Sequence, residues 1–417
     1  MREMKDSGIS WVGEIPKEWS VNRAKYCFVN TKEIAGCMSD RYERLALTMN
    51  GVIKRSKDDS NGLQPEKFET YQILRPDELV FKLIDLQNVS TSRVGLSPYL
   101  GLVSPAYIIL KSNKRVLPAF AEKYFLMLWK NQIFNALGDA GVRSNLNSKD
   151  LLELSIPFPT FNEQQQIADF LDSECGKIDG LKADIQAQID TLEQYKRSVI
   201  TEAVTHGLNP SAPMKDSGIP WVGQFPTHWT KKKGKYILRY MSKPVKQDDG
   251  VITCFRDGDV TLRSNRREDG FTMADKEIGY QGVDAGDLVV HGMDGFAGAI
   301  GISDSRGKAS PVLNVLNTKQ NKKYIMYYLR SMAYGEVFTA LSTGIRVRSC
   351  DLRWNKLAEL LYPLPPIDEQ NNIVNHIDNQ IARTNEIIAD KKSQIETLDG
   401  YKKSLIYEYV TGKKEVV

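Results

Sequence analysis

The sequence lacks the features of membrane, disulfide-stabilised and zinc-binding proteins. None of its 417 positions lies in an apolar run of 18 or more residues, so no membrane span is predicted. The opening residues, MREMKDSG, contain no apolar stretch like that of a signal peptide. The five cysteines are odd in number and form no C-x-x-C pair, which predicts neither a disulfide framework nor a zinc site. We therefore expect a cytoplasmic protein.

Motifs for nucleic-acid chemistry are missing together. LPPID (364–368) lacks the aromatic residue of the Asp/Asn-Pro-Pro-Tyr tetrapeptide of adenine methyltransferases. GISDSRGKA (301–309) fails as a phosphate loop on spacing, and Ala309 stands where a magnesium-binding hydroxyl is needed. The four histidines are isolated, and His291, on a predicted strand, is expected to be structural rather than catalytic. The chain is thus predicted to have no catalytic residue and no bound metal.

Two segments of the sequence occur twice. MKDSGISWVGEIPKEW (4–19) returns as MKDSGIPWVGQFPTHW (214–229), with eleven of sixteen positions identical. The segment 156–205 aligns without a gap on 362–411, and the sequence between these repeats diverges. The repeats predict two variable domains, each followed by a constant segment. The expected boundaries are 1–155 and 214–361 for the domains, 206–213 for a linker, and 156–205 and 362–417 for the constant segments.

Each constant segment is predicted to be one long helix. Neither contains proline after Pro159 or Pro366, and a helix of more than 40 residues is about 60 Å long. Asn162 and Asp368 are the expected N-caps. Apolar residues recur in the first helix at heptad spacing, with Leu181 and Tyr195 at intermediate positions, and form a stripe in the second that Thr384 and Lys391 interrupt, so that the seam widens or slips there. The predicted seam residues are Leu171, Ile178, Ile185, Leu192, Val199, Ile377, Ile388, Ile395 and Leu405.

We expect the two long helices to pack against each other, because a solitary helix would leave its apolar stripe in water. The two helices could pack parallel or antiparallel. Antiparallel packing places equivalent domains at equivalent ends and gives a pseudo-two-fold axis. We predict this antiparallel coiled coil, with the two domains held apart by it.

The variable domains read as mixed α/β (α+β) units. Short apolar runs predict strands in 43–49, 78–84 and 106–111, and again in 250–255, 287–293 and 311–316. Each domain then ends in an aromatic-rich helix, at 118–137 and 322–341.

Positive charge is local rather than global. The net charge is only +4, yet 229–246 holds seven basic residues and no acidic ones. Such stretches usually form a solvated face. Arginine beside Asn, Ser and Gln in loops is also the chemistry that reads bases and grips phosphates. The DNA-binding candidates chosen on that chemistry are Lys82, Gln87, Asn88, Arg93, Asn145, Lys231, Lys232, Arg256, Arg263, Arg266, Arg267 and Arg346.

The repeated KDSGIPWVGQFPTHW and the PLPPIDEQNNI that opens the second long helix resemble the specificity subunits of type I restriction–modification systems. The resemblance covers essentially the whole chain. It implies a non-catalytic DNA-binding subunit in which each variable domain is a target-recognition domain for half of a bipartite, asymmetric site. Arg143 and Arg348 match the family's G-x-R neighbourhood, which implies a contact with the DNA backbone.

The resemblance also implies partners. The long helices would contact two methyltransferase subunits, which carry S-adenosylmethionine, and the full nuclease adds restriction subunits that use ATP and magnesium. This chain itself would bind no cofactor. The alternative from a different class is a bivalent protein-binding scaffold with a coiled-coil spacer, which needs no basic loops on both domains. A self-contained methyltransferase or nuclease is disfavoured by the missing motifs.

Overall fold

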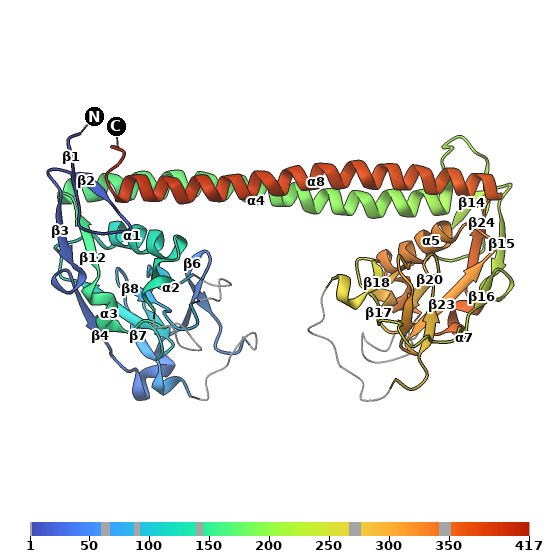
Figure 1. The fold of residues 1–417 in the computed structure, drawn as a ribbon, viewed down its shortest axis with the longest axis horizontal. Coiled ribbons are helices and arrows are strands. Elements are labelled where there is room, and N and C mark those ends of the chain that lie inside the picture. The colour runs from blue at the N-terminus through green and yellow to red at the C-terminus, as the bar shows by residue number, and fades with distance from the viewer. Residues whose placement is uncertain are drawn as a thin grey trace. The chain divides into compact units, whose positions relative to one another are not determined.

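The computed structural model describes residues 2–59, 67–86, 92–138, 145–266, 277–341 and 352–416. The chain divides into two compact units (Figure 1). Unit 1 comprises Met1–Ile185 and Ser393–Val417, and unit 2 comprises Gln186–Lys392. Both units combine short strands with helices, as expected for mixed α/β domains. None of the helices in the described ranges is long and apolar enough to cross a membrane.

Unit 1 is built on two four-stranded sheets, ordered β6-β5-β10-β7 and β4-β11-β8-β9, with the pairs β1-β2 and β12-β3 beside them. Its strands are β1 (Met4–Asp6), β2 (Glu14–Pro16), β3 (Ser20–Arg23), β4 (Phe28–Thr31), β5 (Arg44–Thr48), β6 (Gly51–Arg55), β7 (Gln72–Leu74), β8 (Leu79–Phe81), β9 (Val94–Leu96), β10 (Gly101–Val103), β11 (Ile108–Ser112) and β12 (Ser155–Phe158). Its α-helices are α1 (Pro118–Lys130), α2 (Ile133–Leu137), α3 (Ser148–Glu153), the first part of α4 (Phe161–His206) and the last part of α8 (Ile367–Val410).

Unit 2 has one four-stranded sheet, ordered β16-β23-β20-β21, and the pairs β17-β18, β19-β22, β15-β24 and β13-β14. Its strands are β13 (Met214–Asp216), β14 (Gln224–Pro226), β15 (Thr230–Lys233), β16 (Leu238–Tyr240), β17 (Ile252–Cys254), β18 (Val260–Leu262), β19 (Gln281–Val283), β20 (Leu288–His291), β21 (Ile300–Ile302), β22 (Gly307–Ala309), β23 (Leu313–Thr318) and β24 (Leu361–Leu364). Its α-helices are the last part of α4, α5 (Lys322–Tyr334), α6 (Val337–Ala340), α7 (Trp354–Glu359) and the first part of α8 (Ile367–Val410).

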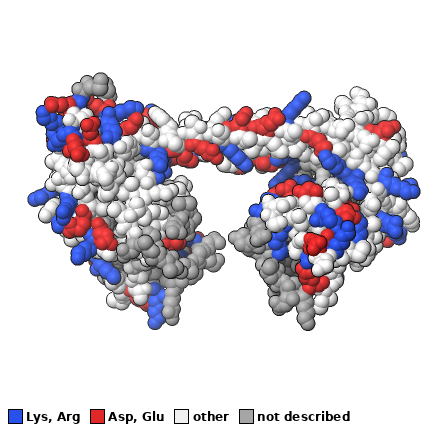
Figure 2. Space-filling model, in the orientation of Figure 1, with Lys and Arg blue, Asp and Glu red and all other residues white. Residues whose placement is uncertain are grey.

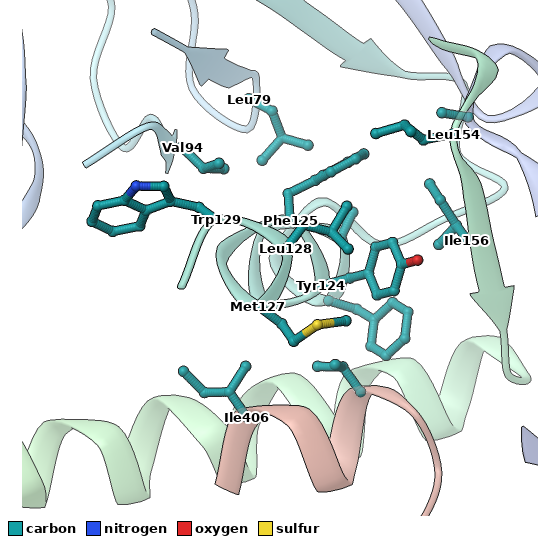
Figure 3. Packing of buried hydrophobic residues seen from close by; sticks show 14 of the residues in the cluster. Leu79, Val94, Tyr124, Phe125, Met127, Leu128, Trp129, Leu154, Ile156 and Ile406 are labelled. Atoms are coloured by element: carbon teal, nitrogen blue, oxygen red, sulfur yellow. The ribbon is translucent and has the colours of Figure 1, made fainter. Parts of the chain in front are cut away.

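The core of unit 1 joins the sheet β4-β11-β8-β9 to the long helices. Helix α1 lies at its centre, and Figure 3 shows Met127 of α1 next to Ile406 of α8, while Tyr124 faces Ile156 of β12. Leu79 of β8 closes the core from the other side. The core of unit 2 is likewise built around a central helix and the long helices, and it includes Tyr324 and Tyr328 of α5 and Ile377 of α8.

The helix that ends each variable domain is shorter than its sequence predicts. The expected helix 118–137 breaks between α1 and α2, where Gln132 has a left-handed φ of 58°. The expected helix 322–341 breaks in the same way at Glu336, with φ of 56°. A left-handed residue cannot continue an α-helix, so both breaks are sharp turns. Amphipathic periodicity continues through the turns, which is why the sequence reads as unbroken.

The long helices are observed at nearly their expected lengths, but each begins two residues earlier than its predicted N-cap implies. Asn162 lies inside α4, and the side chain of Thr160 accepts the N–H of Glu163 at 3.3 Å instead. Asp368 likewise lies in the first turn of α8. There an acidic residue favours the positive end of the helix dipole without being the cap.

The apolar face of α4 differs in part from the expected one. Leu171 and Ile178 are buried, and Ile185, Leu192 and Val199 are half-buried. Leu181 and Tyr195 are about half exposed and do not belong to the seam; the second set of seam positions lies at Cys175 and Ile189. Spacing alternates by four and three residues along a seam, so the second set follows the first by four.

The buried face of α8 keeps its spacing through the two polar residues. Ile377, Ile388 and Leu405 are buried, Ile395 is half-buried, and Thr384, which was expected to break the pattern, is itself buried. The face keeps heptad spacing through Thr384 and Lys391. A polar residue therefore occupies a regular seam position without displacing the pattern.

Within each unit, α4 and α8 contact one another in opposite chain directions. In unit 1, Lys402 of α8 bonds to Asp179 at 2.6 and 2.7 Å, and Lys182 of α4 bonds to Asp399. In unit 2, Lys196 of α4 bonds to Asn385 at 2.8 Å, and Lys391 bonds to Gln188. In both units the residue numbers rise along one helix while they fall along the other.

Candidate nucleic-acid interface

Strands β8 and β20 hold the same place in their units. Each lies in the middle of a sheet and pairs antiparallel with the next strand in matching register, Leu79 opposite Leu96 in unit 1 and Leu288 opposite Ile302 in unit 2. Both strands are buried and lead to a polar residue at their carboxyl end. That residue is Lys82, directly after β8, or His291, the last residue of β20.

At the end of β8, four polar residues form a cluster. The backbone N–H of Lys82 donates to the carbonyl of Arg93 at 3.0 Å, and the guanidinium of Arg93 donates to the carbonyl of Asp85. The side chain of Asn145 accepts the N–H of Asp85 at 3.0 Å. Burial lowers the pKa of Lys82, and the charge of Arg93 lowers it further. The structure therefore brings together three of the predicted residues: Lys82, Arg93 and Asn145.

At the end of β20, unit 2 contains a cavity of about 650 Å³. Its lining includes the three predicted arginines of unit 2 that the structure describes, Arg256, Arg263 and Arg266, together with His291 and Asp294. The arginines come from the β17–β18 hairpin and the residues around it, where Thr253 and Thr261 stand opposite one another. Figure 2 shows basic and acidic side chains intermixed on this unit.

Acidic neighbours fix the arginines of the cavity. Arg256 donates to Asp294 at 2.9 Å. Arg266 is paired with Asp257 and Asp259 and lies over the ring of Phe255, 4.2 Å from its centre. The pKa of Asp257 is lowered, chiefly by the hydrogen bond from Arg266. Because these pairs are partly exposed, they stabilise the fold weakly.

His291 is oriented by the turn that follows it. Its Nδ1 accepts the backbone N–H of Asp294 at 2.9 Å and that of Met293 at 3.2 Å. Its Nε2 lies 4.0 Å from the carboxylate of Asp294. Burial lowers the pKa of the ring, and Arg256 adds to that effect while Asp294 opposes it.

Lys231 and Lys232 lie elsewhere in unit 2. They are exposed on β15, which pairs with β24 rather than with the strands around the cavity. The ammonium group of Lys231 bonds to the carbonyl of Ser217. The structure therefore does not gather these two lysines with the arginines of the cavity.

Six predicted residues fall outside the described residues, namely Gln87, Asn88, Arg143, Arg267, Arg346 and Arg348. The chain on the carboxyl side of two of these segments returns to the strand ends. The N–H of Leu146 donates to the carbonyl of Leu83 at 3.0 Å, and that of Leu352 donates to the carbonyl of Gly292 at 2.8 Å.

Asp85 and Asp294 are not among the residues predicted from the sequence, and His291 was expected to be structural. A signal was present. Aligning the Leu-Val pair of 79–80 with that of 288–289 places Lys82 opposite His291 and Asp85 opposite Asp294. Lys82 and His291 share polarity rather than identity, and a single matching aspartate is too short for a search for identical motifs to find.

The chain is similar in sequence to known proteins. Residues 84–191 match the family model of the type I restriction modification DNA specificity domain. The chain is 22% identical, over 97% of its length and 96% of the relative's, to the protein assigned as the type I restriction enzyme MjaX specificity subunit in Methanocaldococcus jannaschii. It is 20% identical, over 85% of its length and 81% of the relative's, to the type I restriction enzyme StySPI specificity subunit of Salmonella potsdam.

A solved structure shares the fold. A chain from a study of complex assembly and conformational transition in the type I R-M system has a TM-score of 0.66 at 12% identity, and the match covers 96% of this chain and 99% of that one. Together with the sequence matches, it confirms the resemblance of this chain to type I specificity subunits.

Proposed function

We propose that this chain, as a protein that resembles type I specificity subunits along nearly its whole length, selects the DNA sequence for such a system. Each variable domain reads one half of a bipartite, asymmetric site in double-stranded DNA. The chain directs two methyltransferase subunits to that site, and restriction subunits where the system has them. It is not itself an enzyme.

The observation that carries this proposal is the correspondence of the two strand ends. Lys82 lies at the carboxyl end of β8 in unit 1, and His291, beside Arg256, lies at the carboxyl end of β20 in unit 2; both strands are buried and pair in the same register. Two independent readers of DNA need such a polar, donor-rich group on each domain. A scaffold for proteins has no need of one at corresponding places, so this arrangement favours DNA over the scaffold alternative.

The long helices are proposed to form an antiparallel coiled coil that serves as spacer. The opposite chain directions of the contacts Lys402–Asp179 in unit 1 and Lys196–Asn385 in unit 2 support this packing. The duplication in the sequence supports an internal repeat in which each half supplies one reading domain and one helix. Exposed faces of the helices are then available to the methyltransferase subunits.

Chemistry is assigned to the partners. S-adenosylmethionine belongs to the methyltransferase subunits, which reach their target base by taking it out of the duplex. ATP and magnesium belong to the restriction subunits. This chain determines which adenine is placed at the active site of the methyltransferase subunit.

The experiment is to map methylated bases in a host that expresses the methyltransferase subunit with and without this chain. We expect methylation at one bipartite motif, present only when both are expressed. The isolated chain, incubated with DNA and S-adenosylmethionine, should transfer no methyl group. Methyl transfer by the isolated chain would overturn the non-catalytic assignment. Identical methylation with and without the chain, and no shift of duplex DNA at low salt, would favour the scaffold.

A further inference from the structure

The tautomer of His291 follows from its hydrogen bonds. Because Nδ1 accepts two backbone N–H groups, the neutral ring carries its proton on Nε2. In the part of the chain that the structure describes, this N–H makes no hydrogen bond, and the carboxylate of Asp294 is 4.0 Å away. His291 thus presents one oriented donor to the cavity. The lowered pKa of the ring keeps it in this neutral form near pH 7.

Arg256 supplies further donors beside His291. It lines the same cavity, its side chain is 62% exposed, and its guanidinium is held by Asp294 at 2.9 Å. A guanidinium bound on one edge keeps donors on the other. The cavity therefore faces a ligand with N–H groups from two side chains. A partner that fits carries two adjacent acceptors.

Lys82 holds the corresponding place in unit 1. It follows β8 as His291 ends β20, and Asp85 follows it at the same distance in sequence as Asp294 follows His291. An ammonium group only donates hydrogen bonds. Donors at this position are therefore common to both units, while the residue type differs.

We infer that Lys82 and His291 are corresponding specificity-determining residues, each of which donates a hydrogen bond to the acceptor edge of a guanine in the major groove of its own half-site. Guanine is the base that offers two adjacent acceptors there, O6 and N7. The inference rests on the proposed function, because it needs each unit to lie against DNA.

The test uses two variants, one of which removes the Nε2 donor of the imidazole and the other its Nδ1 acceptor. His291→Asn keeps an acceptor near the position of Nδ1 for the amides of Met293 and Asp294 but removes the Nε2 donor. His291→Gln places an amide donor near Nε2 and removes the acceptor. Both are assembled with the methyltransferase subunit, and binding is measured on the mapped motif and on duplexes with every base substituted in turn.

We expect His291→Asn to bind the mapped motif about tenfold or more weakly, and to lose discrimination at one guanine of one half-site only. His291→Gln should retain discrimination there. A duplex with 7-deazaguanine at that position lacks the N7 acceptor. It should weaken the wild-type complex and leave His291→Asn unaffected. Lys82→Met is the counterpart and should relax one guanine of the other half-site.

The outcomes separate the inference from the function beneath it. A wild-type complex without sequence preference contradicts the proposed function itself. A wild-type complex that prefers its motif, with an unchanged preference profile in His291→Asn, overturns the inference alone. So does a uniform loss of affinity on all duplexes with a reduced salt slope, because that result identifies a phosphate contact.

Discussion

The two units are alike where the sequence repeats and different at the carboxyl ends of β8 and β20. Trp11 donates to the hydroxyl of Tyr124 at 3.1 Å in unit 1, and Trp221 donates to that of Tyr328 at 2.9 Å in unit 2. At the corresponding place beyond β8 and β20, however, unit 1 has Lys82 and unit 2 has His291. The two units thus share the contact made by the repeated N-terminal motif, whereas the residue at the end of the buried strand differs.

Further contacts show why the repeated motifs are long. Trp19 donates to Glu163 at 3.0 Å, as Trp229 does to Glu369. Gln164 accepts the N–H of Leu117 at 2.7 Å, and Gln370 accepts that of Asn321 at 3.0 Å. In both units, therefore, the repeated N-terminal motif and the Glu-Gln pair in the first turn of the long helix contact one another. Together they fasten each variable domain to its helix.

The largest expected effect comes from breaking that fastening in each unit. Trp19→Ala and Trp229→Ala each remove a fully buried ring, so each should cost about 3–5 kcal/mol of unfolding free energy. Hydrogen exchange followed by mass spectrometry should show loosening confined to the unit that carries the change. Equal losses are the expectation, and a silent change in either unit would mean that the two fastenings are not equivalent.

A buried ion pair distinguishes unit 2. Asp249, 4% exposed, accepts from Arg306 at 2.8 and 3.0 Å, whereas the pair Arg75–Glu33 of unit 1 is largely exposed. Arg306→Met should cost about 2 kcal/mol at neutral pH, because it leaves a buried carboxylate without its cation. Arg75→Met should cost less than about 1 kcal/mol.

The difference in unfolding free energy between wild type and Arg306→Met should disappear at acidic pH. Arg306 lowers the pKa of Asp249 to about 2, from 3.8 in the unfolded chain. The contribution of the pair is therefore complete above pH 3.8 and is lost as the pH falls toward 2. Denaturant titrations at several pH values should show wild type and Arg306→Met converging in that window. A constant difference between them would contradict the assignment.

A smaller effect should come from making the seam of α8 resemble that of α4. Thr384 is 4% exposed and donates to the carbonyl of Gln380 at 2.7 Å, while the repeat places Ile178 at its counterpart. Thr384→Ile should raise stability by about 1 kcal/mol, since it buries more apolar area. Thr397→Ile, on the exposed face, is the matched control and should give no gain in thermal melting.

The smallest effect concerns a hollow in unit 2. Phe170 and Tyr409 pack in unit 1 with ring centres 4.5 Å apart, and the repeat replaces them by His376 and Ala203, which line a cavity of about 770 Å³. The double change His376→Phe with Ala203→Tyr should stabilise unit 2 by about 0.5–1.5 kcal/mol. Destabilisation in a thermal melt would show that the hollow does not accept the ring pair.

The sequence predicted the arrangement of elements better than the details of the site. All six expected strands are present, since alternating apolar runs between turn residues carry a local signal. The breaks at Gln132 and Glu336 escaped because neither residue is the glycine that usually marks a left-handed turn. Leu181 and Tyr195 were assigned to the seam because their apolar character alone does not fix which side of a helix is covered.

The site could be predicted only in part because its groups come from different elements. Arg93 precedes β9, whereas Arg256 follows β17, so no common spacing links them to Lys82 or His291. The orientation of the His291 ring depends on two backbone amides in the following turn. Such geometry has no signature in residue types.

The most direct test of the account is to exchange one variable domain. Residues 20–155 are replaced by the corresponding segment of a relative with a different known motif, the foundation contacts of Trp19 and Glu163 are retained, and methylated bases are mapped. We expect the methylated motif to have a new first half-site and an unchanged second half-site. A change in both half-sites, or in neither, would contradict independent reading by the two units.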